Sequence, residues 1–198
     1  MSICKNPSRR HAPPGILTTG LLGLVTCAAA FAPAVLAEET TSAAETVITE
    51  RCAEAREVML EHRLPASPEV VYEAILSVET ASEWIGSPLF ELVDTEVNAR
   101  PGGSFRYLFR GPDGVEFAMH GMFHELEAGS RIVHSESYDG IDWEPLRVTT
   151  VLRAIDGGTL LRASVVHPSE EICQINAPNL AQSTPATFAR LADYLARR

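Results

Sequence analysis

Positive charge is scarce in this 198-residue sequence, which has 16 Lys and Arg residues against 26 Asp and Glu, a net charge of −10. Most of the arginines stand singly among acidic residues and form no basic stripe. A nucleic-acid surface needs such a stripe to neutralise phosphates, so we expect no nucleic-acid partner. The same acidity argues against electrostatic docking on anionic lipid.

Motifs for nucleotide binding, nucleophilic catalysis and metal binding are also lacking. No Ser-His-Asp order with a nucleophile elbow is present, and the pairs Gly102-Gly103 and Gly157-Gly158 are typical of turns, not of phosphate loops. His120 and His124, four apart in one predicted strand, are separated by roughly 13 Å, too far to share one metal ion. His124 and His134 can meet across the hairpin, but no third ligand is evident. We therefore expect no metal and no cofactor.

Acidic residues are absent from the first 37 positions, where three basic residues precede an apolar run over 16–36. This pattern predicts a signal peptide (residues 1–37) that is cleaved after Ala37, and hence a secreted or periplasmic protein. The alternatives are an uncleaved N-terminal membrane anchor and, less favoured, lipidation at the box Leu24–Cys27. Cleavage leaves 13 basic residues against 26 acidic ones, a net charge of −13.

Cysteine is rare, with four residues in the chain. Cys4 and Cys27 leave with the predicted signal peptide, so Cys52 and Cys173 remain. Two thiols in an oxidising compartment favour a disulfide.

What remains is an ordinary globular composition, 45% apolar and 21% charged, at a length that suits one domain. Residues 38–56 are polar and predict a loose leader or a short helix. The domain proper is predicted at 57–198 and opens with a strand over Val58–Leu64 that Pro65 stops. Ser67 and Pro68 then start a helix, and a second short helix is predicted over Ala81–Trp84.

The hydrophobic period changes to two between residues 89 and 167. Segments of about eight residues alternate with turns at 100–103, 111–114, 128–130, 138–140 and 156–158, a spacing that predicts an antiparallel meander. With the opening strand we expect about seven strands. The apolar face of residues 186–196 predicts a closing helix that packs on the sheet, which makes the fold α+β.

These segments resemble a known family in order and spacing. The stretch Leu64–Ala74, then Trp84, then Pro101–Tyr107, and later Phe188–Leu191 are similar to homologues of the heat-shock protein 90 ATPase activator, within the START-like (SRPBCC, polyketide-cyclase) superfamily. The resemblance covers roughly residues 58 to 197. It implies a helix-grip fold, in which a curved seven-stranded antiparallel sheet wraps around a long C-terminal helix and two short helices follow the first strand.

The resemblance also implies a cavity for an apolar ligand. Phe105, Tyr107 and Phe109 alternate along one predicted strand and project to one face, either as a ligand-lining wall or as a filled core. Tyr138 and Trp143 flank a later turn and are expected at the mouth. We add Trp84 to the predicted cavity residues, although packing of the short helices is its favoured role.

Three functions follow, in order of preference. The first is an exported protein that binds a small apolar molecule. The second is a cyclase- or hydrolase-like enzyme, for which Glu136 and His120 are the weak catalytic candidates, because both are expected to face a low-dielectric cavity. The third is a protein-interaction module of the chaperone-activator type, which export disfavours. We expect binding without catalysis.

The helix-grip topology also pairs the two remaining cysteines. It places the first strand beside the last, antiparallel, so residues just before Val58 lie near those just after His167. Cys52 and Cys173 occupy these two places, and we predict a disulfide between them. It would close a loop of about 120 residues and add roughly 4 to 5 kcal/mol by the chain-entropy estimate.

Overall fold

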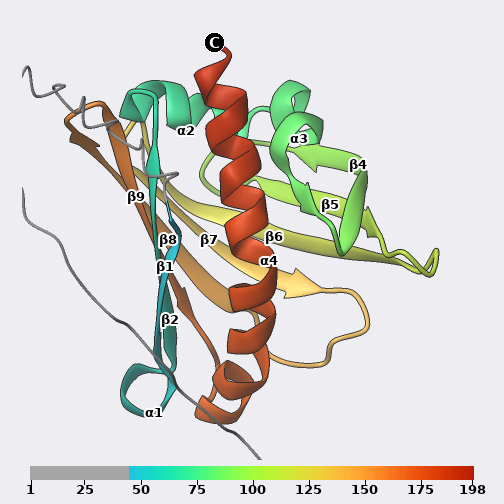
Figure 1. Cartoon of the computed structure of the whole chain (residues 1–198). Coiled ribbons are helices and arrows are strands. Elements are labelled where there is room, and N and C mark those ends of the chain that lie inside the picture. The colour runs from blue at the N-terminus through green and yellow to red at the C-terminus, as the bar shows by residue number, and fades with distance from the viewer. Residues whose placement is uncertain (1–44) are drawn as a thin grey trace, which may run out of the picture. The chain divides into compact units, whose positions relative to one another are not determined.

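The computed structural model describes residues 45–198, which form nine strands and four helices (Figure 1). In chain order these are β1 (Val47–Arg51), α1 (Cys52–Ala55), β2 (Glu57–Leu64), α2 (Pro68–Leu76), α3 (Val78–Trp84), β3 (Gly86–Ser87), β4 (Phe90–Val97), β5 (Ser104–Arg110), β6 (Glu116–Glu127), β7 (Arg131–Tyr138), β8 (Leu146–Ile155), β9 (Gly158–Val166) and α4 (Glu170–Ala196). The predicted signal peptide, its cleavage site and the alternative anchor lie outside the described residues.

All nine strands form one antiparallel sheet in the order β1-β2-β9-β8-β7-β6-β5-β4-β3. The first long strand, β2, lies beside the last, β9, with Val58 opposite Val165. Helix α4 lies across one face of this sheet, and α2 and α3 lie near its C-terminal end (Figure 1). The α+β helix-grip architecture predicted from the sequence is confirmed.

The strand number corrects the prediction, since the described residues contain nine strands where seven were expected. The two additional strands are β1 and the two-residue β3. Residues 38–56, expected to form a loose leader or a short helix, contain the short helix α1 and also the strand β1, which was not predicted. Four of the five residues of β1 are exposed, so no hydrophobic alternation marked it. Pairing with the edge of β2 holds it instead.

Helix α4 begins at Glu170, 16 residues before the predicted start at residue 186. Ser169 caps it, because its hydroxyl accepts a hydrogen bond from the Ile172 amide at 3.2 Å. Pro178 and Pro185 lie inside the helix. Proline normally interrupts a helix, and polar residues also break the apolar face of this segment, so the sequence pattern was visible over residues 186–196 alone.

The predicted turns separate the strands as expected. Each of the five turn segments links two neighbouring antiparallel strands of the meander from β4 to β9. Helix α2 begins at Pro68 as predicted, although the Ser67 side chain makes no capping hydrogen bond. Helix α3 begins at Val78, three residues before the predicted start.

Cys52 and Cys173 form a disulfide, as predicted, with their Cα atoms 5.5 Å apart. Both cysteines are buried. The bond joins α1 to the first turn of α4 and spans 121 residues of sequence. It therefore ties one end of the helix to the edge of the sheet.

None of the helices within residues 45–198 is long and apolar enough to cross a membrane.

Candidate ligand-binding cavity

A cavity of about 690 Å³ lies between the inner face of the sheet and α4. Residues of α2, α3, β2, α4 and the strands from β4 to β9 line it. Its volume falls in the range of about 300 to 1,000 Å³ that is usual for small-molecule sites. The space is too large to be a packing defect, because close-packed interiors leave few voids larger than one water molecule.

The six residues predicted to line a cavity all lie on its wall: Trp84, Phe105, Tyr107, Phe109, Tyr138 and Trp143. Their contact with a ligand stays a prediction. The three aromatic residues on β5 are buried and form a continuous aromatic surface, in which the ring centroids of Phe105 and Tyr107 are 5.5 Å apart. Phe109 stacks on Phe117 of β6 at 5.4 Å. These rings form the apolar wall of the cavity.

Gly121 on β6 makes room for this wall. It lies opposite Phe105 in the sheet register, and a Cβ atom at Gly121 would lie 2.7 Å from the Phe105 ring and 1.8 Å from the carbonyl oxygen of Ser135. The absent side chain lets the ring cross β6 and reach Phe123 and His134, whose centroids each lie 5.2 Å away.

A group of three polar residues on β7 interrupts the apolar lining. His134, Glu136 and Tyr138 alternate along this strand, so all three point into the cavity. The His134 Nε2 atom lies 3.5 Å from Glu136 Oε2, and the Tyr138 hydroxyl donates a hydrogen bond to Glu136 Oε1.

Burial and the charge of Glu136 raise the pKa of both tyrosines near this group. Burial raises the pKa of Tyr107 to about 12, and the negative charge of Glu136 contributes to the shift. Burial also raises the pKa of Tyr138 well above 10.0, with further contributions from the charge of Glu136 and from the hydrogen bond between them. Both phenols are therefore neutral at physiological pH, and the Tyr138 hydroxyl remains a donor.

Two buried nitrogen atoms beside the cavity have no hydrogen-bond partner among the described residues: His134 Nδ1 and Trp143 Nε1. Buried polar atoms in native proteins nearly always find a partner. The hydrogen-bonding capacity of these two nitrogens is thus unused within residues 45–198. Trp84 differs, since its Nε1 donates to the Ala74 carbonyl at 3.3 Å and fixes α3 on α2.

Helix α4 contributes a polar strip to the cavity, which sequence reasoning missed. Asn176, Asn179, Ser183, Thr184 and Thr187 line the cavity from this helix. Their helical spacing was the available signal, but the two prolines hid the helix that carries them. The cavity therefore has aromatic side chains on its sheet side and hydroxyl and amide groups on its α4 side.

His120 does not face the cavity, which corrects its proposed role beside Glu136. It lies on β6 opposite Arg106, its side chain is 46% exposed, and its Nε2 lies 3.5 Å from the exposed Asp139 carboxylate. His124 sits at a β-bulge and is exposed, whereas His134 points inward, so these two do not meet. Within residues 45–198 no three His, Cys, Asp or Glu side chains are placed to hold a metal ion.

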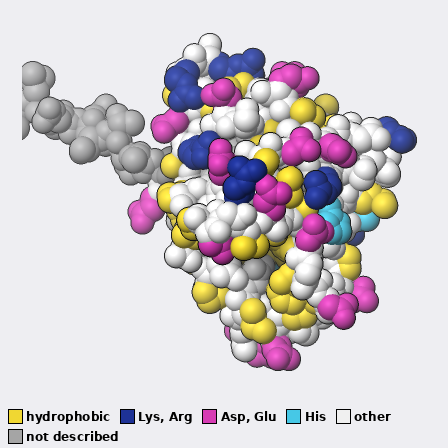
Figure 2. Space-filling view, turned by 90° about the vertical axis from the view of Figure 1, so that its right-hand side faces the viewer, with side chains coloured by type: hydrophobic (Ala, Val, Ile, Leu, Met, Phe, Trp, Pro, Cys, Tyr) yellow, Lys and Arg dark blue, Asp and Glu magenta, His cyan; other side chains and the backbone are white. Residues whose placement is uncertain are grey.

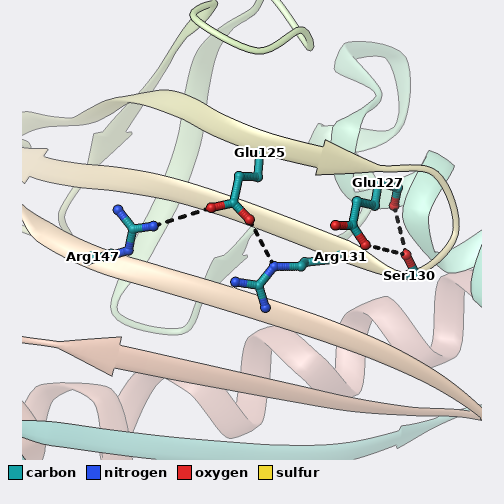
Figure 3. Close-up of polar contacts among 5 residues, drawn as sticks. All are labelled: Glu125, Glu127, Ser130, Arg131 and Arg147. Atoms are coloured by element: carbon teal, nitrogen blue, oxygen red, sulfur yellow. Dashed lines mark hydrogen bonds and ion pairs between the residues drawn. The ribbon is translucent and has the colours of Figure 1, made fainter.

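Some charged side chains on the outer face of the sheet are paired. Glu125 pairs with Arg131 Nε at 3.1 Å and with Arg147 at 3.5 Å, and Ser130 donates a hydrogen bond to Glu127 (Figure 3). Such exposed pairs stabilise a fold by about 0 to 1 kcal/mol. The face drawn in Figure 2 likewise has basic side chains intermixed with acidic ones, without a continuous basic patch.

The fold and the site together define a helix-grip domain with an internal, largely apolar cavity. The family model described as "Activator of Hsp90 ATPase homolog 1-like protein" matches residues 65–196, and the chain belongs to this family. The match covers every cavity-lining element except β2.

Solved structures from bacteria share the fold. A protein from Rhodobacter sphaeroides superposes with a TM-score of 0.71 at 23% identity, covering 78% of this chain and 99% of that chain. A protein from Chromobacterium violaceum gives 0.64 at 24% identity, with 71% and 96% covered. An AHSA1-like protein from Aeromonas hydrophila gives 0.59 at 17% identity, with 72% and 95% covered. No curated protein matches the sequence significantly.

Proposed function

We propose that this protein is an exported binding protein that encloses a small, largely apolar molecule between the sheet and α4. The observation that carries the proposal is the cavity of about 690 Å³ with its buried aromatic wall. Burial of apolar ligand surface against this wall supplies the affinity, at about 25 cal/mol per Å² before the costs of association. The polar strip on α4 and the group on β7 orient the molecule.

Export is supported by the disulfide between Cys52 and Cys173, because disulfides persist mainly in oxidising compartments. The predicted signal peptide agrees with this location. An exported position separates the protein from cytosolic chaperones and ATP, so we place a chaperone-activator role last.

The cluster on β7 favours one alternative, an enzyme that uses the same cavity. Glu136 and His134 are 12% and 16% exposed, and a carboxylate beside an imidazole is able to move a proton. This pair replaces the predicted pair of Glu136 and His120. Turnover of a bound ligand, rather than its release unchanged, distinguishes the enzyme from the binding protein.

The first experiment is expression of the full chain in a bacterium, followed by fractionation and mass spectrometry of the intact protein. We expect a periplasmic protein that begins at Glu38, is two hydrogens lighter than its reduced form, and carries an apolar adduct under native conditions. An uncleaved cytoplasmic protein would contradict export. A protein that never carries cargo, from any fraction or after incubation with apolar extracts, would contradict ligand binding.

Ala163→Leu tests the cavity directly, because Ala163 lines it on β9. The added volume occupies part of the space, so we expect weaker retention of the adduct by at least several fold. Ala154→Leu is the matched control, since Ala154 is exposed on β8 and does not line the cavity. Equal retention by the two variants, both folded by circular dichroism, would place the ligand elsewhere.

A further inference from the structure

The charges that face the cavity are all of one sign. No Lys or Arg of the described chain lines it, whereas the carboxylates of Glu136 and Asp139 do. Asp139 is exposed and lies beside His120, so solvent screens it at the rim. Glu136 is 12% exposed and is the charge that a ligand in the cavity meets.

Glu136 is only partly compensated by its neighbours. Tyr138 donates one hydrogen bond to it, and the His134 ring approaches at 3.5 Å. A carboxylate has about four lone-pair positions, so acceptor capacity remains. Placing a charge that is only partly compensated in a low-dielectric site is costly, and a ligand of opposite charge would recover part of that cost.

Aromatic faces near Glu136 suit the same ligand. Tyr107 and Tyr138 are close enough for the Glu136 charge to raise the pKa of each, and Phe105 packs on both Tyr107 and His134. The negative faces of aromatic rings attract cations by about 0.5 to 2 kcal/mol each, more when water is excluded. They also repel a carboxylate or a phosphate.

We propose that the cavity is selective for a lipophilic amine, a molecule whose ammonium group pairs with Glu136 and whose apolar body lies on the β5 aromatic wall. This inference deepens the proposed function and rests on it. A fatty acid would place a second carboxylate beside Glu136, without a basic side chain to balance either. A neutral alcohol would bind but gain no charge pairing. The order of affinity is therefore amine, then alcohol, then carboxylate.

The test compares decylamine, decanol and decanoate, which share one chain length and differ in the head group. Trp84 and Trp143 are the chain's two tryptophans and both line the cavity, so intrinsic fluorescence reports occupancy. Displacement of the neutral probe Nile red gives an independent reading. We expect decylamine to bind at least about tenfold more tightly than decanol, and decanoate to bind least.

Glu136→Gln keeps the shape of the side chain and removes its charge, so we expect the amine preference over decanol to disappear. Glu73→Gln removes the same charge from the exposed surface of α2 and should leave the preference unchanged. The preference should also persist at high salt, because a buried pair is screened less than the acidic surface. This salt series on the unaltered protein keeps the test valid if Glu136→Gln does not fold.

The outcomes separate the two proposals. Equal affinities for the three ligands, tighter binding of decanoate, an amine preference that salt abolishes, or one that survives Glu136→Gln would overturn amine selectivity and leave apolar binding in place. Failure of all three ligands to bind or to displace Nile red would overturn the proposed function as well.

Discussion

At the scale of single residues, the cavity depends on two unlike positions, Glu136 and Gly121. Glu136 supplies a charge where the surrounding wall is apolar and aromatic. Gly121 supplies space, since any side chain there would meet the Phe105 ring. One residue defines the electrostatics of the site and the other defines its shape.

Glu136→Gln should lower the pKa of Tyr107 from about 12, because the negative charge that opposes its ionisation is removed. Burial remains, so the pKa should stay above its ordinary value of 10.0. Ultraviolet titration of the phenolate band in both proteins measures the difference. If the pKa of Tyr107 were the same in both proteins, the charge of Glu136 would not contribute to it.

Gly121→Ala should destabilise the fold by about 1 to 3 kcal/mol, because the new methyl group displaces the Phe105 ring and the neighbouring strand. Chemical denaturation measures the loss. Gly111→Ala is the control, since its one close approach would be to the movable end of the Asp113 side chain, at 2.8 Å, with the Val115 carbonyl oxygen at an ordinary 3.6 Å. If both variants lose the same stability, the close approach at Gly121 is not the cause.

At the scale of elements, α4 is both a structural member and a wall of the site. Its buried residues pack on the sheet, its polar strip faces the cavity, and Cys173 anchors its first turn to α1. Movement of this helix would change the cavity directly, so its attachment matters for the shape of the cavity as well as for stability.

Replacing both cysteines, Cys52→Ser with Cys173→Ser, should lower the free energy of unfolding by roughly 4 to 5 kcal/mol, because an open chain gains entropy when it unfolds. Denaturant titration of the variant and of the oxidised protein measures the loss. The reduced natural chain should behave like the double variant. A free-thiol assay that finds two reactive cysteines in protein from the periplasm would contradict the disulfide.

Elements with a regular hydrophobic pattern could be predicted from the sequence, and those held by partners could not. The period-two alternation located the strands from β4 to β9, and the aromatic row on β5 located one wall of the cavity. β1 was not predicted, because hydrogen bonds to β2 hold it and no hydrophobic pattern marks it. The first part of α4 was not predicted, because Pro178 and Pro185 lie within it.

The site could be predicted only in part, for a related reason. Phe105, Tyr107 and Phe109 were found because strand alternation tells which side chains share a face. Tyr138 and Trp143 were found from their place beside a turn, and Trp84 from the family resemblance. His120 was misplaced because alternation does not say which of the two faces lies inside. The inward face of β6 became clear only from its pairing with β5 and β7.

At the scale of the whole molecule, two buried histidines join separate parts of the fold. His62 on β2 contacts Thr46 through Nδ1 at 2.9 Å and packs on Phe188 of α4 at 5.4 Å. His167, after β9, contacts the Arg56 carbonyl at 3.1 Å and Asn176 of α4 at 3.1 Å. Each would have to accept a charge in its buried place if the pH fell.

Stability should therefore fall in mild acid. Burial lowers the pKa of His62 and of His167 below the ordinary value of 6.5, so the unfolded chain binds more protons than the folded chain in this range. The stabilisation is fully present above pH 6.5 and is lost as the pH falls through the lower pKa values of the folded state. Thermal melts between pH 8 and pH 5 measure the loss, and His62→Asn should flatten the profile. A midpoint independent of pH would contradict this account.

The disulfide also makes most of the domain a covalent ring. The bond between residues 52 and 173 encloses β2 to β9 and the turns that connect them. A single cut by a protease in one of those exposed turns, such as residues 111–114, opens the ring without releasing a fragment. The two pieces of the sheet remain tethered and paired, so one cleavage does not by itself dismantle the domain. Covalent closure thus separates the cutting of an accessible loop from the loss of a fragment.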